Sequence, residues 1–317
     1  MEGQRDLNPN KPIENSISDA EKMRSFLETE QIKLAKEFME KQKDLPLEEQ
    51  ITISADFRIV PPTKTFSDTQ RMAANENIFK NHKSLDPLEV RKDENKRAGF
   101  LLEMLKTSIM HKKMGKQFIV VRSSRYDDGI NKVDNVIVDR NTGLTVCAFD
   151  EVSPRSMTDD KVMENKIMEV SGRNSGFMAK SEGFGSPIEI KLEQGVRLKH
   201  GISFKDGKIS CKEINHLPIF WLAVDQKMLD KAIRQFKNEA TSSENENDLF
   251  LYFLLIILIQ IREIKTKGYA NLPSDMQTRI EKFETFIEER PEIKKLELKK
   301  SGEITSTVFR KLLSRLS

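Results

Sequence analysis

The sequence predicts an α/β (α+β) protein with a mixed central sheet of about five to six strands, flanking helices, and helical extensions at both ends. Three short apolar runs follow one another between residues 118 and 152, and such runs separated by turn residues are typical of strands. Apolar residues recur at helical spacing on both sides of this region. Residues 217–224 (LPIFWLAV) form a continuous apolar run, as expected of a strand buried on both faces.

Composition and helix-start signals divide the chain into segments. Residues 1–17 are polar and predicted to be a disordered tail, and residues 18–85 form an N-terminal helical segment that begins with a capping box at Ser18 and Glu21. Residues 86–240 form the α/β core domain, whose first helix is signalled by Asp86 followed by a proline. Residues 241–317 form a C-terminal helical segment with a further capping box.

Local patterns predict the individual elements. Apolar residues at helical spacing predict helices over residues 18–42, 67–80, 86–115, 157–170, 225–237, 249–267, 274–289 and 305–316. Strands are predicted over residues 51–59, three times between 118 and 152, in a hairpin over 202–211, and over 217–224. The Gly- and Ser-rich residues 171–187 predict a mobile loop.

Composition narrows the functional classes. The chain has 317 residues, of which 32% are charged, and its net charge of +3 is too small to indicate nucleic-acid binding by itself. Cys147 and Cys211 are too few for a zinc site or a disulfide framework, which fits a reducing, cytoplasmic setting. The apolar run at residues 249–261 is shorter than the ~20 residues of a membrane span, so we expect a buried core helix and no membrane partner.

Carboxylates lie at the ends of two strands that we expect to be neighbours. Asp134 opens the second strand, and Asp150 and Glu151 close the third. The turn signal at residues 141–143 makes these strands antiparallel neighbours, which places the acids at one rim of the sheet. Oxygen ligands in this arrangement suit Mg²⁺, which lowers the pKa of bound water and neutralises charge on a phosphate. The other interpretation is that each acid is an ordinary turn or cap residue.

In these residues the chain resembles the PD-(D/E)XK nuclease superfamily, over about residues 95–170, or roughly a quarter of its length. The family pattern of a glycine followed four residues later by glutamate fits Gly99 and Glu103, and the aspartate at the head of the second strand fits Asp134. On the third strand, Asp150 and Glu151 are followed by Val152, where the family has lysine.

The resemblance implies a site with named roles. Asp134 and either Asp150 or Glu151 would hold Mg²⁺, and Glu103 would assist. Lys161 or Lys166, on the following helix, would replace the missing strand lysine. Asp127 or Asp128 could serve as a substitute metal ligand.

Basic residues near the acids allow two interpretations. Arg122 and Arg125 would bind phosphate at the end of the first strand, or form salt bridges with the acidic residues 126–129, which we expect to be a loop. Glu103 would either take part in the site or be a boundary residue beside an apolar helical stripe.

Two functional hypotheses result. The first is a Mg²⁺-dependent nuclease-like domain that hydrolyses phosphodiesters of DNA or RNA. The second is a catalytically inactive binding or scaffold protein of the same fold, as a homodimer through its C-terminal helices. The missing strand lysine favours the second, and the strand order with its acids favours the first.

Overall fold

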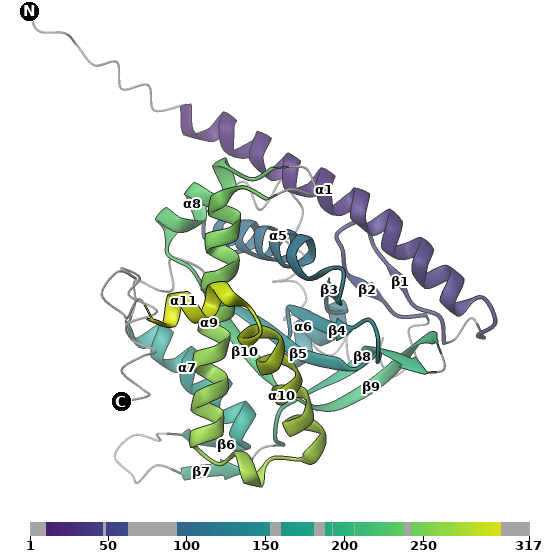
Figure 1. Cartoon of the computed structure of the whole chain (residues 1–317), viewed down its shortest axis with the longest axis vertical. Helices are drawn as coiled ribbons and strands as arrows, with labels where there is room; N and C mark the ends of the chain where they lie inside the picture. Colours follow the sequence, from purple (N-terminus) through teal and green to yellow (C-terminus); the bar gives the residue numbers. More distant parts are fainter. Residues whose placement is uncertain are drawn as a thin grey trace, which may run out of the picture.

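A four-stranded mixed sheet lies at the centre of the computed structural model, with the strand order β10-β5-β4-β3 (Figure 1). Strands β3 (Phe118–Arg122), β4 (Asn135–Asp139) and β5 (Thr145–Val152) form an antiparallel meander, and β10 (Ile219–Ala223) pairs with β5 in parallel. The structure describes residues 11–46, 49–62, 94–152, 160–180, 188–191, 193–205, 207–237 and 242–298. The predicted α/β (α+β) class is confirmed.

The turn between β4 and β5 shows how the sequence builds the meander. Asp139 accepts hydrogen bonds from the backbone N–H groups of Asn141 and Thr142, at 3.0 and 2.7 Å. Gly143 has φ +68°, a left-handed conformation that glycine adopts without strain. The predicted turn and the antiparallel pairing of these strands are therefore confirmed.

The central sheet has four strands, whereas the sequence predicted five to six strands. The other strands form two-stranded sheets of their own: β1 (Thr52–Ile53) with β2 (Ile59–Val60), β6 (Phe177–Lys180) with β7 (Ile188–Lys191), and β8 (Val196–Lys205) with β9 (Lys208–Leu217). Strands β8 and β9 pair with each other on either side of Gly207, with register shifts on both sides of Leu198, and pack against β5 without joining its sheet.

Two further predictions need correction. The strand predicted over residues 51–59 is a hairpin, because the chain reverses at Phe57, which has φ 62°. The mobile loop predicted over residues 171–187 is wrong for residues 171–180, because helix α7 (Asp160–Ser175) continues to Ser175 and strand β6 follows it directly; residues 181–187 lie outside the described part of the structure.

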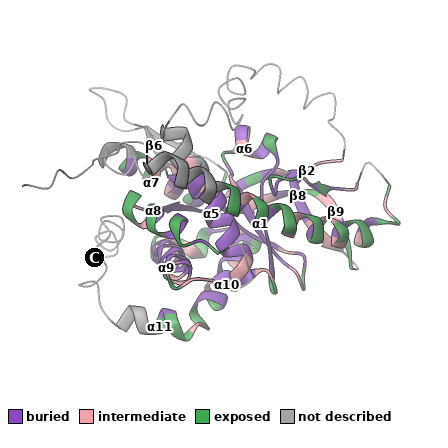
Figure 2. Ribbon diagram, turned by 90° about the horizontal axis from the view of Figure 1, so that it is seen from above, coloured by how far each residue is buried: buried purple, intermediate pink, exposed green. Residues whose placement is uncertain are grey.

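Helices cover the sheet on one face. Those that contact it are α5 (Glu94–Met114), α9 (Glu244–Thr266) and α10 (Ser274–Glu288), and the 3₁₀ turn η1 (Tyr269–Asn271) lies between α9 and α10. Helices α8 (Gln226–Arg234) and α11 (Pro291–Leu298) pack on these helices. Figure 1 shows α9 and α10 crossing in front of β10 and β5, which they contact. In Figure 2 the sheet and α9 form the buried centre of the molecule.

Helix α9 confirms the prediction of a buried core helix. Residues 249–261 are buried except Leu251, and the helix begins with the expected capping box of Ser243 and Glu246. Within the described residues, no helix combines the length and the apolar character that crossing a bilayer requires.

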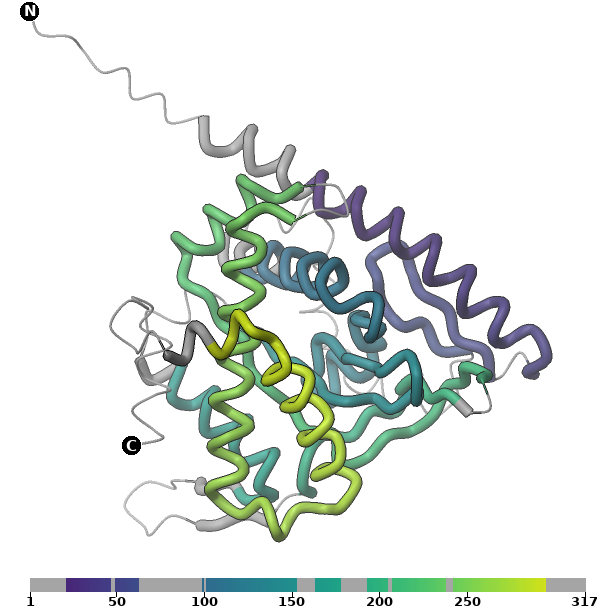
Figure 3. Tube along the Cα trace, in the orientation of Figure 1, coloured from purple at the N-terminus to yellow at the C-terminus, as the bar shows by residue number. Residues whose placement is uncertain are grey.

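The N-terminal helix α1 (Lys11–Gln42) lies alongside the β1–β2 hairpin and packs on α5 and β9 (Figure 3). It begins before Ser18, the cap expected from the sequence. One hydrophobic cluster links Met23 of α1 to Ile293 of α11. The helices predicted over residues 67–80 and 305–316, and the start signal at Asp86, lie outside the described residues, and the division into segments stays a prediction.

Candidate functional site

Asp134 lies at the head of β4, next to the end of β5. Its backbone N–H donates to the carbonyl of Phe149 at 2.9 Å, and its Oδ2 accepts from the backbone N–H of Glu151 at 2.8 Å. The strand register, which pairs Asn135 with Phe149, thus places Asp134 beside the acids of β5 as the sequence predicted. Part of its surface remains exposed.

Asp150 and Glu151 point to opposite faces of the sheet, because successive strand residues alternate. Asp150 forms an ion pair with Lys166 of α7. Glu151 forms an ion pair with Lys106 of α5, on the face where Lys106 also lies over the ring of Phe149. The structure therefore brings Lys166 to the site and separates the two acids that the sequence offered as alternatives.

Lys106 is a site residue that sequence reasoning missed. It is fully buried, and its Nζ donates to Asn135 Oδ1 at 2.7 Å in addition to its contact with Glu151. The signal was present in the sequence: Lys106 occupies the i+4 position of the apolar stripe that begins at Leu102. A charged residue in a buried stripe indicates a buried partner.

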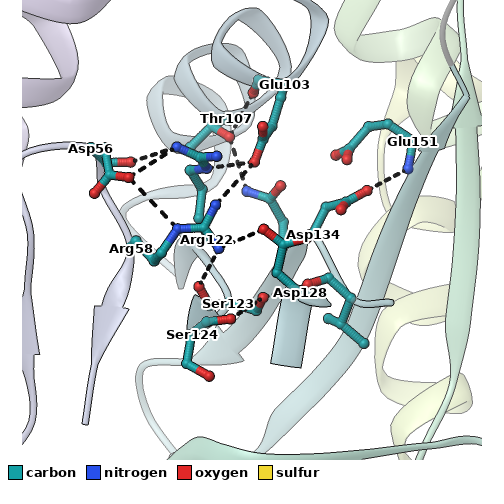
Figure 4. A network of polar contacts seen from close by, with 12 residues as sticks. Asp56, Arg58, Glu103, Thr107, Arg122, Ser123, Ser124, Asp128, Asp134 and Glu151 are labelled. Carbon is teal, nitrogen blue, oxygen red and sulfur yellow. Dashed lines mark hydrogen bonds and ion pairs between the residues drawn. The ribbon is translucent and has the colours of Figure 1, made fainter. Parts of the chain in front are cut away.

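A second cluster of charges lies beside the first (Figure 4). Arg122, the last residue of β3, forms ion pairs with Glu103 of α5 and with Asp56, whose Oδ2 is 3.3 Å from Nη1. Arg58 of the β1–β2 hairpin lies 2.9 Å from Asp128 and 3.6 Å from Asp56. Neither Asp56 nor Arg58 was a candidate from the sequence.

The residues expected to be an acidic loop form a short helix, α6 (Arg125–Asn131). Ser124 caps it: its Oγ accepts from the Asp127 backbone N–H at 3.1 Å and donates to the Asp127 carboxylate at 2.7 Å. That carboxylate also accepts from the backbone N–H groups of Lys199 and His200, so Asp127 anchors α6 to β8. The loop predicted over residues 126–129 is therefore wrong, because the Ser124 cap starts a helix there.

The remaining candidates occupy different environments. Arg125 is exposed at the start of α6, and Arg122 is buried. Arg122 pairs with Glu103 and Asp56, which are not the acids of residues 126–129 that we considered as its partners. Lys161 lies in the first turn of α7, and its side chain is outside the described part of the structure.

Burial and neighbouring charges perturb the site. Burial, together with the charges of Asp150 and Asp128, raises the pKa of Asp134 well above its usual range. Burial also raises the pKa of Asp150, although Lys166 opposes this effect. Burial lowers the pKa of Lys106 to about 8. Perturbed groups at the end of a sheet are typical of functional sites.

The pKa values of Arg122 and Asp56 are shifted in opposite directions, and both shifts favour the charged form of the side chain. Burial opposes the charge on Arg122, but Glu103 and Asp56 outweigh it and raise the pKa of this guanidinium. Burial also disfavours the charge on Asp56, yet the Ser54 hydroxyl and nearby arginines lower the pKa of this carboxyl. Arg122 is therefore a permanent cation, and Asp56 is ionised at neutral pH.

The side chains at this site suit one Mg²⁺ ion held by two carboxylates better than a site with three or more protein ligands. Asp134 and Asp150 offer oxygen ligands, and Mg²⁺ is usually bound by one or two carboxylates with water and phosphate completing its shell. Across the described ranges, no three or more histidine, cysteine, aspartate or glutamate side chains are grouped as a metal site would require. Glu151, the third expected ligand, is held by Lys106.

Comparisons with protein-family models, with curated proteins and with solved structures find no match for this chain. The resemblance to the PD-(D/E)XK superfamily therefore depends on the residues and strand order of this chain alone.

Proposed function

We propose that the chain is a metal-dependent, nuclease-like enzyme that hydrolyses phosphodiesters of DNA or RNA. The observation that carries the proposal is the pairing of Asp134 with Asp150 at one end of adjacent strands, with Lys166 beside Asp150. The order α5, β3, β4, β5, α7, which the resemblance requires, supports it, with the short helix α6 inserted between β3 and β4.

Asp134 and Asp150 would hold Mg²⁺, which when bound lowers the pKa of a water molecule and neutralises charge on the scissile phosphate. Lys166, from the helix after the third strand, takes the part of the missing strand lysine and orients water or offsets developing charge. Glu103 assists by fixing the Arg122 guanidinium, and Arg122 and Arg125 meet the phosphate backbone. A cytoplasmic location, suggested by two free cysteines, belongs to the same proposal.

Cleavage assays test this function. Purified protein should cut single- or double-stranded DNA or RNA in Mg²⁺ or Mn²⁺, and Asp134→Asn should lower the rate by at least about a hundredfold. Asp230→Asn, a change of the same kind at an exposed residue of α8, should retain the wild-type rate. Absence of cleavage on every substrate, with Asp134→Asn equal to wild type, would refute the proposal.

The second candidate is a non-catalytic binding or scaffold protein, and one observation favours it. Lys106 and Lys166 already compensate Glu151 and Asp150, so these two acids are charge-paired without a metal. Under this hypothesis, divalent cations leave the melting temperature unchanged. The associated homodimer is tested by light scattering at two concentrations. The C-terminal helices predicted to form this homodimer include residues 249–261 of α9, which are largely covered by the chain's own elements.

A further inference from the structure

Asp56 occupies a distinctive position at the edge of the candidate site. Its Oδ2 lies 3.3 Å from Arg122 Nη1 and 3.6 Å from Arg58 Nε, and Arg125 also contributes to its electrostatic environment. Figure 4 shows this carboxylate facing both buried guanidinium groups. A single acid therefore lies at the focus of three arginines from the β1–β2 hairpin, β3 and α6.

The structure fixes the backbone of the hairpin next to this acid. Phe57, between Asp56 and Arg58, has φ 62°, a left-handed conformation that is strained for a residue with a side chain. The ring of Phe57 is fully buried, and its carbonyl accepts from the backbone N–H of Arg122 at 2.9 Å. Strained backbone persists where the surrounding structure fixes it, which is common at functional sites.

The carboxylates around the arginines fall into two kinds. Glu103 and Asp128, with 15% and 19% of their side chains exposed, anchor Arg122 and Arg58 respectively. Asp56 is 47% exposed, and its contacts with both arginines are longer than the ~2.7–2.9 Å of a strong charge-assisted hydrogen bond. The arginines would thus stay in place if Asp56 moved away.

We propose that Arg58 and Arg122, with Arg125 at the rim, form a subsite for a phosphodiester of the substrate backbone, and that Asp56 holds this position until the substrate displaces it. A phosphodiester carries one negative charge, as does the Asp56 carboxylate, so the exchange leaves the charge of the cluster unchanged. Arginine also matches the two unesterified oxygens of a phosphodiester with paired N–H donors. This inference rests on the proposed function and identifies its substrate contact.

Fluorescence anisotropy with labelled single-stranded and duplex DNA and RNA tests the subsite, in Ca²⁺ and in EDTA. Asp56→Asn should tighten binding by about fivefold, because the competing anion is removed. Arg58→Gln should weaken binding by at least about tenfold, and Arg58→Lys should recover only part of the loss. A methylphosphonate oligonucleotide, which lacks the backbone charge, should bind Asp56→Asn and wild type equally.

The matched control is Glu213→Gln, which removes one negative charge from an exposed acid that also pairs with an arginine, Arg197. It should leave the affinity unchanged. Asp56→Asn decides the question even if Arg58→Gln fails to fold, because misfolding cannot tighten binding. Unchanged or weaker binding by Asp56→Asn, or no binding by wild type, would overturn the subsite.

The subsite and the proposed function can fail separately. Tighter binding by Asp56→Asn without any cleavage in Mg²⁺ would retain the subsite and reject the nuclease. Cleavage by the wild type, with equal affinity for wild type and Asp56→Asn, would retain the nuclease and reject the subsite.

Discussion

Replacing Asp134 with asparagine should stabilise the protein while it abolishes the proposed activity. Partial burial of Asp134 and the negative charges of Asp150 and Asp128 disfavour its ionised form, and the charge of Lys106 opposes them only in part. Asparagine keeps an oxygen that can accept from the Glu151 backbone N–H, which Asp134 now binds at 2.8 Å. The substitution therefore removes repulsion and retains the hydrogen bond.

The expected gain is about 1 kcal/mol in the free energy of unfolding near neutral pH. A gain of this size is typical of substitutions that remove a destabilising group from a functional site. It corresponds to a rise in Tm of about 2 °C for a chain of this size. Urea unfolding measured by the fluorescence of Trp221, the single and buried tryptophan, gives the free energy directly.

The pH dependence has a defined sign. The folded-state pKa of Asp134 is raised, so the unfolded chain releases its proton first as the pH increases, and the folded wild type loses stability until its own pKa is passed. The advantage of Asp134→Asn should therefore be small below the ordinary aspartate pKa of 3.8 and grow above it.

Asp139, at the other end of β4, is the matched control. Hydrogen bonds from Thr142 and the charge of Lys282 outweigh burial and lower the pKa of this carboxyl, so it stabilises the fold above the ordinary value and loses that effect as the pH falls. Asp139→Asn should cost about 2 kcal/mol at neutral pH. A destabilised Asp134→Asn, with a loss similar to that of Asp139→Asn, would refute the reasoning on like-charge repulsion.

Three further perturbations test other parts of the molecule. Lys106→Met should cost about 3–5 kcal/mol in urea unfolding because it leaves Glu151 buried and unpaired, and adding Glu151→Gln should recover most of the loss. Since the pKa of Lys106 is lowered to about 8, wild type should gain stability between about pH 8 and 10.5, and Lys106→Met should not. Gln260→Leu should cost about 1–3 kcal/mol and speed amide exchange at Trp221, whose N–H and C=O the Gln260 amide now binds at 3.1 and 2.9 Å. Lys166→Met should increase the Tm shift caused by Mg²⁺, because it removes a cation that competes for Asp150, and it should also lower the cleavage rate. If Mg²⁺ shifts the Tm of neither wild type nor Lys166→Met, the scaffold hypothesis is favoured.

Helices, strands and turns were predicted correctly from the sequence where a single local signal determines the structure. The buried strand at residues 219–223, the Asn-Thr-Gly turn and the Ser243 capping box follow from apolar runs, turn chemistry and cap geometry. The same reasoning placed Asp134 and Asp150 beside each other, because antiparallel neighbours joined by a short turn share their ends.

Pairings across the chain could not be predicted in this way. Arg58 contacts the Ser123 carbonyl at 3.0 Å, across a separation of 65 residues, and no periodicity or turn signal connects the two. The partner of Glu151 was similarly hidden, since the sequence shows that Lys106 lies in an apolar stripe but not which acid it faces. Such contacts depend on how helices and hairpins pack on the sheet, which is set by tertiary structure.

The distribution of charge partners separates Asp134 from the other acids of the site. Asp56, Glu103, Asp128, Asp150 and Glu151 each form an ion pair with an arginine or a lysine. For Asp134 the described side chains provide no such pair, and its Oδ2 binds only an uncharged N–H group. Burying an acid beside other acids costs free energy, and the raised pKa of Asp134 expresses that cost, although the charge of Lys106 opposes it. Asparagine would keep the hydrogen bond without that cost; under the proposed function, the carboxylate serves to hold Mg²⁺.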